Sequence, residues 1–190
     1  KFHTLHQLVP YLIWKDNTRN LRATPEVVRV DPTFKYEVMD FPGGETLKYC
    51  FQCGTCTSSC PTARFASSYR PRHIIRMAQL GLRELVLSSS ALWLCTACFT
   101  CTDRCPQGVE VSSVLRVLRN FAVSEGFVPE AYKSMMENIM TTGYAYKILG
   151  SRLKRRSLLG LPPLPSGNAE ALRKISRILG LPLSRESKPL

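Results

Sequence analysis

The chain has 190 residues, of which 44% are hydrophobic, and a formal net charge of +12. This length predicts one domain, or one domain with arms. The longest uncharged run, residues 85–102, is long enough to cross a membrane, but it contains three cysteines, three serines and three threonines. A transmembrane segment is therefore excluded, and the chain is expected to be soluble.

Residues 1–45 are expected to form an N-terminal arm. The apolar residues at positions 5, 8, 9, 12 and 13 have helical spacing. Val27–Val30 and Phe34–Met39 are predicted to be short extended pieces. No catalytic group stands out in this segment.

The centre of the chain contains one cysteine motif twice, C-x2-C-x2-C-x3-C-P, and the two copies use all eight cysteines. The spacing is typical of bacterial-type [4Fe–4S] ferredoxins, in which three closely spaced cysteines bind one cluster and the fourth binds the other. The cysteines predicted to bind the first cluster are Cys50, Cys53, Cys56 and Cys105. Those predicted to bind the second are Cys95, Cys98, Cys101 and Cys60.

Two other uses of cysteine fit this spacing less well. Structural zinc also takes C-x2-C pairs, but a third cysteine at the same spacing followed by x3-C-P does not suit two pairs of ligands. A disulfide framework is typical of small secreted chains that are much richer in cysteine.

The two loops differ after their second cysteine, where the first has Gly54 and the second has Phe99. Glycine lets the backbone approach the inorganic core closely. We expect Phe99 to shield the second cluster from water. With fewer hydrogen bonds as well, that cluster is expected to have the lower potential.

The segments between and after the motifs predict helices. Apolar stripes at helical spacing run through residues 71–86, 111–126 and 129–140. A small β-type ferredoxin would have hairpins between its motifs, so the fold class expected is mainly α. We predict an α-helical ferredoxin domain over residues 46–145 that holds two [4Fe–4S] clusters.

Residues 146–190 are expected to form a C-terminal arm. From position 150 onward it carries nine Lys and Arg against two Glu. Leu161–Pro165 is predicted to be extended and polyproline-like, and residues 169–179 to form a short amphipathic helix. An acidic partner, nucleic acid, an anionic membrane or plain solvation all suit this charge.

The doubled motif, the helical spacer and the flanking helices resemble the C subunit of heterodisulfide reductase, including that of the related complexes of sulfur oxidisers. The resemblance is best over residues 46–145. It implies an α-helical ferredoxin that relays single electrons between a flavin-containing A subunit and a B subunit with non-cubane clusters, which acts on disulfides or thiols. The adjacent cysteines of the CCG motifs that bind those clusters are absent from this chain.

We therefore expect a non-catalytic electron-relay subunit with no catalytic residue of its own, working in a cytoplasmic, anaerobic complex and not on nucleic acid. Two alternatives stay open. One is a stand-alone two-cluster ferredoxin, although long arms at both ends favour a complex. The other is a zinc-stabilised nucleic-acid-binding module that uses the basic tail, although no basic platform with interleaved aromatic residues is seen.

Overall fold

The computed structural model describes residues 29–165 and 167–178, and this part of the chain is helical without any strand, as the sequence predicts. None of its helices is long and apolar enough to cross a membrane. The α-helices are α2 (Phe34–Asp40), α3 (Thr55–Ser58), α4 (Pro61–Phe65), α5 (Pro71–Gln79), α6 (Arg83–Leu87), α7 (Thr100–Asp103), α8 (Val111–Ser124), α9 (Glu130–Thr142), α10 (Gly150–Leu158) and α11 (Ala169–Ile178). The 3-10 helices are η1 (Glu45–Tyr49) and η2 (Ser90–Leu94).

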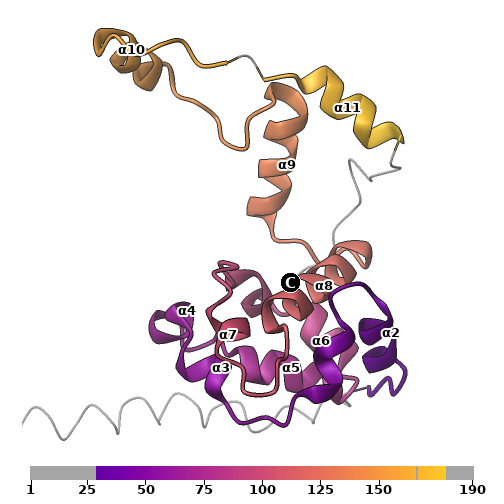
Figure 1. The fold of residues 1–190 in the computed structure, drawn as a ribbon. Helices are drawn as coiled ribbons and strands as arrows, with labels where there is room; N and C mark the ends of the chain where they lie inside the picture. Colours follow the sequence, from indigo (N-terminus) through magenta and orange to yellow (C-terminus); the bar gives the residue numbers. More distant parts are fainter. Residues whose placement is uncertain (1–28, 166, 179–190) are drawn as a thin grey trace, which may run out of the picture.

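Helices α2 to α8 form a compact body with one hydrophobic core (Figure 1). Helices α5 and α8 pack against each other in its centre. Their apolar stripes bury Ile75 of α5 and Leu115 and Leu118 of α8 almost completely. Burial of each such side chain stabilises the fold by about 1.5–3 kcal/mol. The two helices therefore form a firm support for the cysteine loops, which lie beside them.

Helix α2 belongs to this body, and the extended piece predicted at Phe34–Met39 is wrong. Phe34 and Val38 are fully buried in the core. They lie four residues apart and share one face of the helix. In a strand Tyr36 would lie on that face as well, but its side chain is 54% exposed. The first extended piece, Val27–Val30, falls partly outside the described residues.

A cluster of charges around Arg83, the first residue of α6, connects this helix to α2, to the segment before α2 and to the end of α8. Its guanidinium contacts Glu37 and Glu125 at 2.7 Å each and Asp31 at 3.4 Å. The backbone N–H of Asp31 also donates to the Gly81 carbonyl at 2.8 Å. Gly81 has a φ of +72°, and a Cβ there would come within 2.0 Å of the Asp31 carbonyl oxygen. Only glycine fits this close approach of two backbones.

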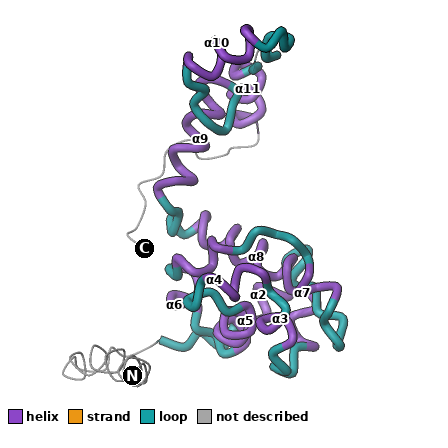
Figure 2. The backbone as a smooth tube through the Cα atoms, turned by 90° about the vertical axis from the view of Figure 1, so that its left-hand side faces the viewer, coloured by secondary structure: helices purple, strands orange, loops and turns teal. Residues whose placement is uncertain are grey.

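Helices α9, α10 and α11 leave the body and form an arm (Figures 1 and 2). Helix α9 rises from the body, and α11 lies beside it. The helices predicted over residues 129–140 and 169–179 correspond to α9 and α11. Helix α9 has no buried residue, so the arm depends little on a core of its own.

Candidate metal centres

The two cysteine loops follow the same backbone course. In each, the residue before the second cysteine and the residue after it have positive φ angles. These are Gln52 (68°) and Gly54 (90°) in the first loop and Ala97 (52°) and Phe99 (62°) in the second. A one-turn helix, α3 or α7, then follows. Left-handed residues that alternate with right-handed ones form concave nests of backbone N–H groups, which suit anionic inorganic cores.

A cavity lies against each loop, and each cavity is lined by three cysteines of one motif and the fourth cysteine of the other. The space not filled by protein atoms, including open solvent at the mouth, is about 360 Å³ at the first cavity and about 260 Å³ at the second. The cysteines of the first cavity are Cys50, Cys53, Cys56 and Cys105. Those of the second cavity are Cys95, Cys98, Cys101 and Cys60. The structure thus brings all eight into two groups of four.

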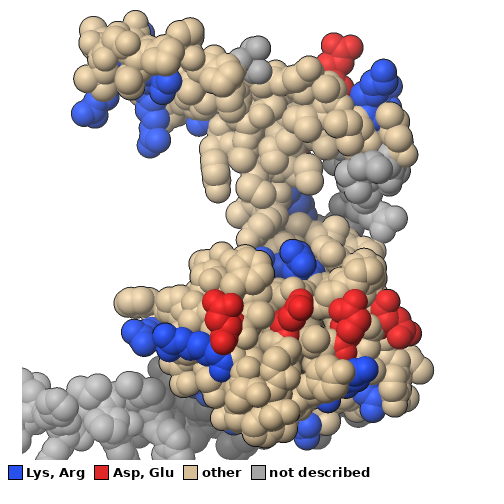
Figure 3. Space-filling model, viewed as in Figure 1, with Lys and Arg blue, Asp and Glu red and all other residues tan. Residues whose placement is uncertain are grey.

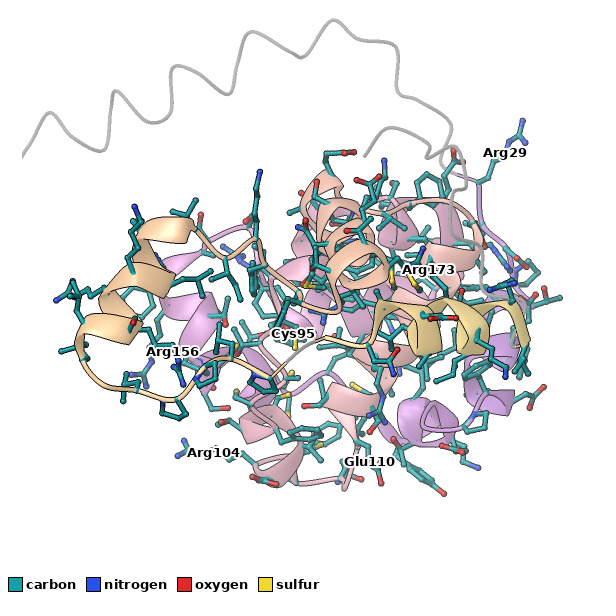
Figure 4. The ribbon with its side chains drawn as sticks, turned by 90° about the horizontal axis from the view of Figure 1, so that it is seen from above. Arg29, Cys95, Arg104, Glu110, Arg156 and Arg173 are labelled. Atoms are coloured by element: carbon teal, nitrogen blue, oxygen red, sulfur yellow. The ribbon has the colours of Figure 1, made fainter. Side chains whose placement is uncertain are left out.

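The exchange of the fourth cysteines follows from how the loops end. Helices α3 and α7 lie next to each other, so the end of each motif reaches the neighbouring loop. Cys60 is extended and precedes Pro61, which opens α4. Seen from above, the sulfur atoms gather in the middle of the body near Cys95, whereas Arg104 and Arg29 lie at its edge (Figure 4).

Sulfur atoms at both cavities take part in hydrogen bonds. At the first cavity the bonds to sulfur come from Gln52 Nε2 to Cys50 (3.4 Å), Thr55 Oγ1 to Cys53 (3.3 Å) and Val109 N to Cys105 (3.3 Å). At the second they join Ala97 N to Cys95 (3.4 Å), Thr100 Oγ1 to Cys98 (3.4 Å), Ser112 Oγ to Cys101 (3.3 Å) and the Tyr69 side chain to Cys95. Such bonds orient metal ligands and tune the metal they bind.

The thiols differ in how easily they ionise. A hydrogen bond with the Thr55 side chain lowers the pKa of Cys53, and Thr100 does the same for Cys98. Burial raises the pKa of Cys56 to about 11 and also raises that of Cys101. A buried thiolate needs a nearby positive charge, and iron supplies one when a cluster binds. The sulfur-only donor set and the nests therefore fit iron–sulfur clusters.

Two side chains that the sequence did not single out anchor the starts of the loops. Gln79 of α5 donates to the carbonyl oxygens of Leu47 (3.3 Å) and Cys50 (2.9 Å). Arg119 of α8 donates to those of Leu92 (3.0 Å) and Cys95 (2.7 Å). Each contacts the first cysteine of a motif and the residue three positions before it.

Helical periodicity places Arg119 on the polar face of its helix, but no pattern in the sequence indicates a bond to a cysteine carbonyl. Gln79 likewise gives no signal, because a lone glutamine near a helix end is common on protein surfaces.

The shielding of the second cluster by Phe99 stays a prediction. Its side chain lines the second cavity but is 46% exposed. The second group of sulfur atoms also has at least as many hydrogen-bond partners as the first, and two of these partners, Tyr69 and Ser112, are buried. The second site is therefore not poorer in hydrogen bonds.

Known proteins share both the motifs and most of the chain. Residues 46–109 match a family model described as a 4Fe-4S dicluster domain. The chain is 39% identical to the C subunit of the H(2):CoB-CoM heterodisulfide,ferredoxin reductase of Methanothermobacter thermautotrophicus. The match extends over 153 residues and covers 79% of this chain and 82% of the relative. The chain belongs to the family of heterodisulfide reductase C subunits.

Other members of this family are similar over comparable lengths. The chain is 37% identical over 153 residues to the iron-sulfur C subunit of the CoB--CoM heterodisulfide reductase of Methanopyrus kandleri, covering 79% of this chain and 77% of the relative. It is 30% identical over 144 residues to a protein of Archaeoglobus profundus described as like the heterodisulfide reductase C subunit. This match covers 75% of this chain and 77% of the relative.

Membership of this family confirms the resemblance noted in the motifs. The chain is an iron–sulfur subunit of a heterodisulfide reductase-type oxidoreductase, and it carries electrons through a 4Fe-4S dicluster domain. It therefore works together with other subunits of that complex.

Proposed function

We propose that this chain relays single electrons through two [4Fe–4S] clusters, between a flavin-containing A subunit and a B subunit with non-cubane clusters. The grouping of the eight cysteines into two cavities carries this proposal. The first cluster is bound by Cys50, Cys53, Cys56 and Cys105. The second is bound by Cys95, Cys98, Cys101 and Cys60. Each cluster, when bound, supplies a one-electron couple whose potential the protein sets.

The residues around the cysteines hold the sites and limit the access of water. Ile75, Val109 and Val111 give the first cavity an apolar wall. At the second cavity, the buried Tyr69 closes one side and bonds to a cysteine sulfur. Limited access of water and hydrogen bonds to sulfur are the means by which proteins tune such clusters. No step in this role requires substrate chemistry on the chain.

The arm supports assembly with partner subunits. Several apolar side chains there are exposed, among them Leu158 (86%), Tyr146 (75%) and Leu159 (66%). Lys and Arg side chains lie on the same part of the arm, above a notch between arm and body (Figure 3). Exposed apolar side chains rimmed by charge are typical of protein interfaces. The proposal also places the complex in a reducing cytoplasm, because thiols persist there.

An anaerobic assay of iron, sulfide and zinc on the purified chain, followed by EPR after dithionite reduction, tests the cluster content. We expect about eight irons and eight sulfides per chain and the spectrum of two interacting reduced clusters. Zinc without sulfide would overturn the proposal and favour the zinc-stabilised module.

The relay itself is tested by mixing the dithionite-reduced chain, freed of excess reductant, with the B subunit and, separately, with the A subunit. We expect stable binding to both and reoxidation of the clusters by whichever partner accepts the electrons. A monomer that binds neither partner would instead indicate a stand-alone ferredoxin.

A further inference from the structure

We propose that Arg119 sets the order of the two cluster potentials. Its charge makes the cluster at Cys60, Cys95, Cys98 and Cys101 the more easily reduced of the pair. This rests on the two-cluster relay proposed above. It also reverses the order that the sequence predicts, in which the second cluster has the lower potential.

Gln79 and Arg119 hold the same place in the two halves of the molecule. Gln79 bonds to the carbonyl of Cys50, the first cysteine of its motif, and Arg119 bonds to that of Cys95. The structural task is the same, but one side chain is neutral and the other is a cation. The two halves therefore differ by one positive charge at an equivalent position.

The charge of Arg119 is poorly screened. Its bonds to the loop are partly buried, and the Trp93 ring lies 5.7 Å from the guanidinium. Among the residues that the structure describes, no carboxylate forms an ion pair with Arg119. A partly buried, unpaired cation acts on nearby charges more strongly than an exposed one. Reduction adds a negative charge to a cluster, so this cation stabilises the reduced form.

Other charges near the sites do not cancel this difference. Arg72 lines the first cavity, but its side chain is exposed and screened by solvent. In the second loop, Asp103 and Arg104 are exposed neighbours of opposite sign. They contribute little net charge there.

Hydrogen bonding favours the same order. The side chains of Tyr69 and Ser112, which bond to sulfur at the second site, are 1% and 7% exposed. At the first site, the side chains that bond to sulfur include Gln52 and Thr55, which are only half-buried. Buried hydrogen bonds to sulfur stabilise the reduced cluster more, since water does not compete with them.

This difference in potential gives electron transfer within the chain a direction, from the first cluster to the second. One electron leaves the reduced first cluster, which returns to the 2+ state. The same electron reduces the second cluster from 2+ to 1+, and no proton or bond changes. With one electron per chain, the second site therefore holds it for most of the time.

Redox titration of the full chain, followed by EPR, tests the proposal with Arg119→Gln and Gln79→Arg. Arg119→Gln should move the higher midpoint down. Gln79→Arg should move the lower midpoint up. Each change should alter the equilibrium between the two clusters about tenfold or more, which corresponds to about 59 mV for one electron. Because each substitution shifts its own cluster, the titration also assigns the midpoints.

Arg119→Lys keeps the charge and should restore most of the shift, which separates charge from the loss of a structural bond. Arg116→Gln, on the exposed face of the same helix, removes one charge elsewhere and should move neither midpoint by a similar amount. The inference is overturned if Arg119→Gln moves the lower midpoint, moves neither, or acts no more strongly than Arg116→Gln.

Iron and sulfide are measured on every variant. About eight of each with the wrong order of midpoints would reject only this inference. Their absence from the unchanged protein would instead reject the relay on which it rests.

Discussion

The indole of Trp93 and the phenol ring of Tyr132 lie 4.7 Å apart between centroids, with their planes tilted by 51°. Trp93 is in η2, directly before the second cysteine loop, and Tyr132 is in α9. The Tyr132 hydroxyl also reaches the Trp93 carbonyl at 3.5 Å. This pair therefore fastens the arm to the body beside a candidate cluster site.

Replacing Tyr132 with alanine should loosen α9 without unfolding the body. An aromatic pair contributes about 0.5–1.5 kcal/mol beyond the area it buries. Amide hydrogen exchange in α9 should therefore become about two to twelve times faster, as measured by mass spectrometry. Tyr146→Ala removes a tyrosine of the arm that is 75% exposed and should leave exchange in α9 unchanged. Equal exchange in both variants would show that the ring pair does not fasten the arm.

The sequence predicts the mainly helical fold because its cues are local. The apolar stripes of α5, α8 and α9 repeat at helical spacing, and the cysteine spacing reflects the wrapping of one loop around one inorganic core. Neither cue depends on distant parts of the chain.

The features that the sequence does not predict depend on long-range contacts. Arg119 and Cys95 are 24 positions apart, and Arg83 joins carboxylates 46 and 42 positions away. The helix at Phe34–Asp40 is short, so its few apolar residues suit a strand equally well until the core shows which face is buried.

Replacing Arg83 with methionine should destabilise the body by about 2 kcal/mol. Partial burial alone would lower the pKa of Arg83, but its bonds to Glu37 and Glu125 raise it, so the side chain stays charged. Removing it leaves carboxylates near one another without a cation. The cost stays below the roughly 3–5 kcal/mol typical of buried pairs, because the Arg83 side chain is 30% exposed. Urea unfolding of the cluster-loaded chain measures the change.

The matched control for that variant is Glu130→Gln. It breaks an i,i+3 ion pair whose carboxylate is 80% exposed, and exposed pairs contribute little. Its midpoint should stay within error of the unchanged chain. A similar loss in both variants would mean that the Arg83 cluster contributes no more than a surface pair.

Alanine at position 81 should cost far more stability than alanine at position 108. Gly81 and Gly108 both have positive φ, 72° and 64°. A Cβ at Gly81 would meet the Asp31 backbone at 2.0 Å, whereas a Cβ at Gly108 meets nothing within 4 Å. Gly108→Ala should lose about 1–2 kcal/mol from the backbone conformation alone, and Gly81→Ala about 3 kcal/mol or more. Thermal unfolding of the two variants compares them, and equal losses would contradict the close approach.

Serine substitutions at single cysteines should fall into two classes. The class should depend on which cavity the cysteine lines and not on which motif it belongs to. Cys105→Ser and Cys50→Ser should both damage the first cluster, because both side chains line the first cavity. Each variant should retain about four irons and give the same EPR spectrum after reduction, that of the second cluster alone. Cys101→Ser shares its motif with Cys105 but lines the other cavity, so it should leave the complementary spectrum. If the spectrum of Cys105→Ser instead matched that of Cys101→Ser, each motif would bind its own cluster with all four of its cysteines, and the exchange of the fourth ligand would be excluded.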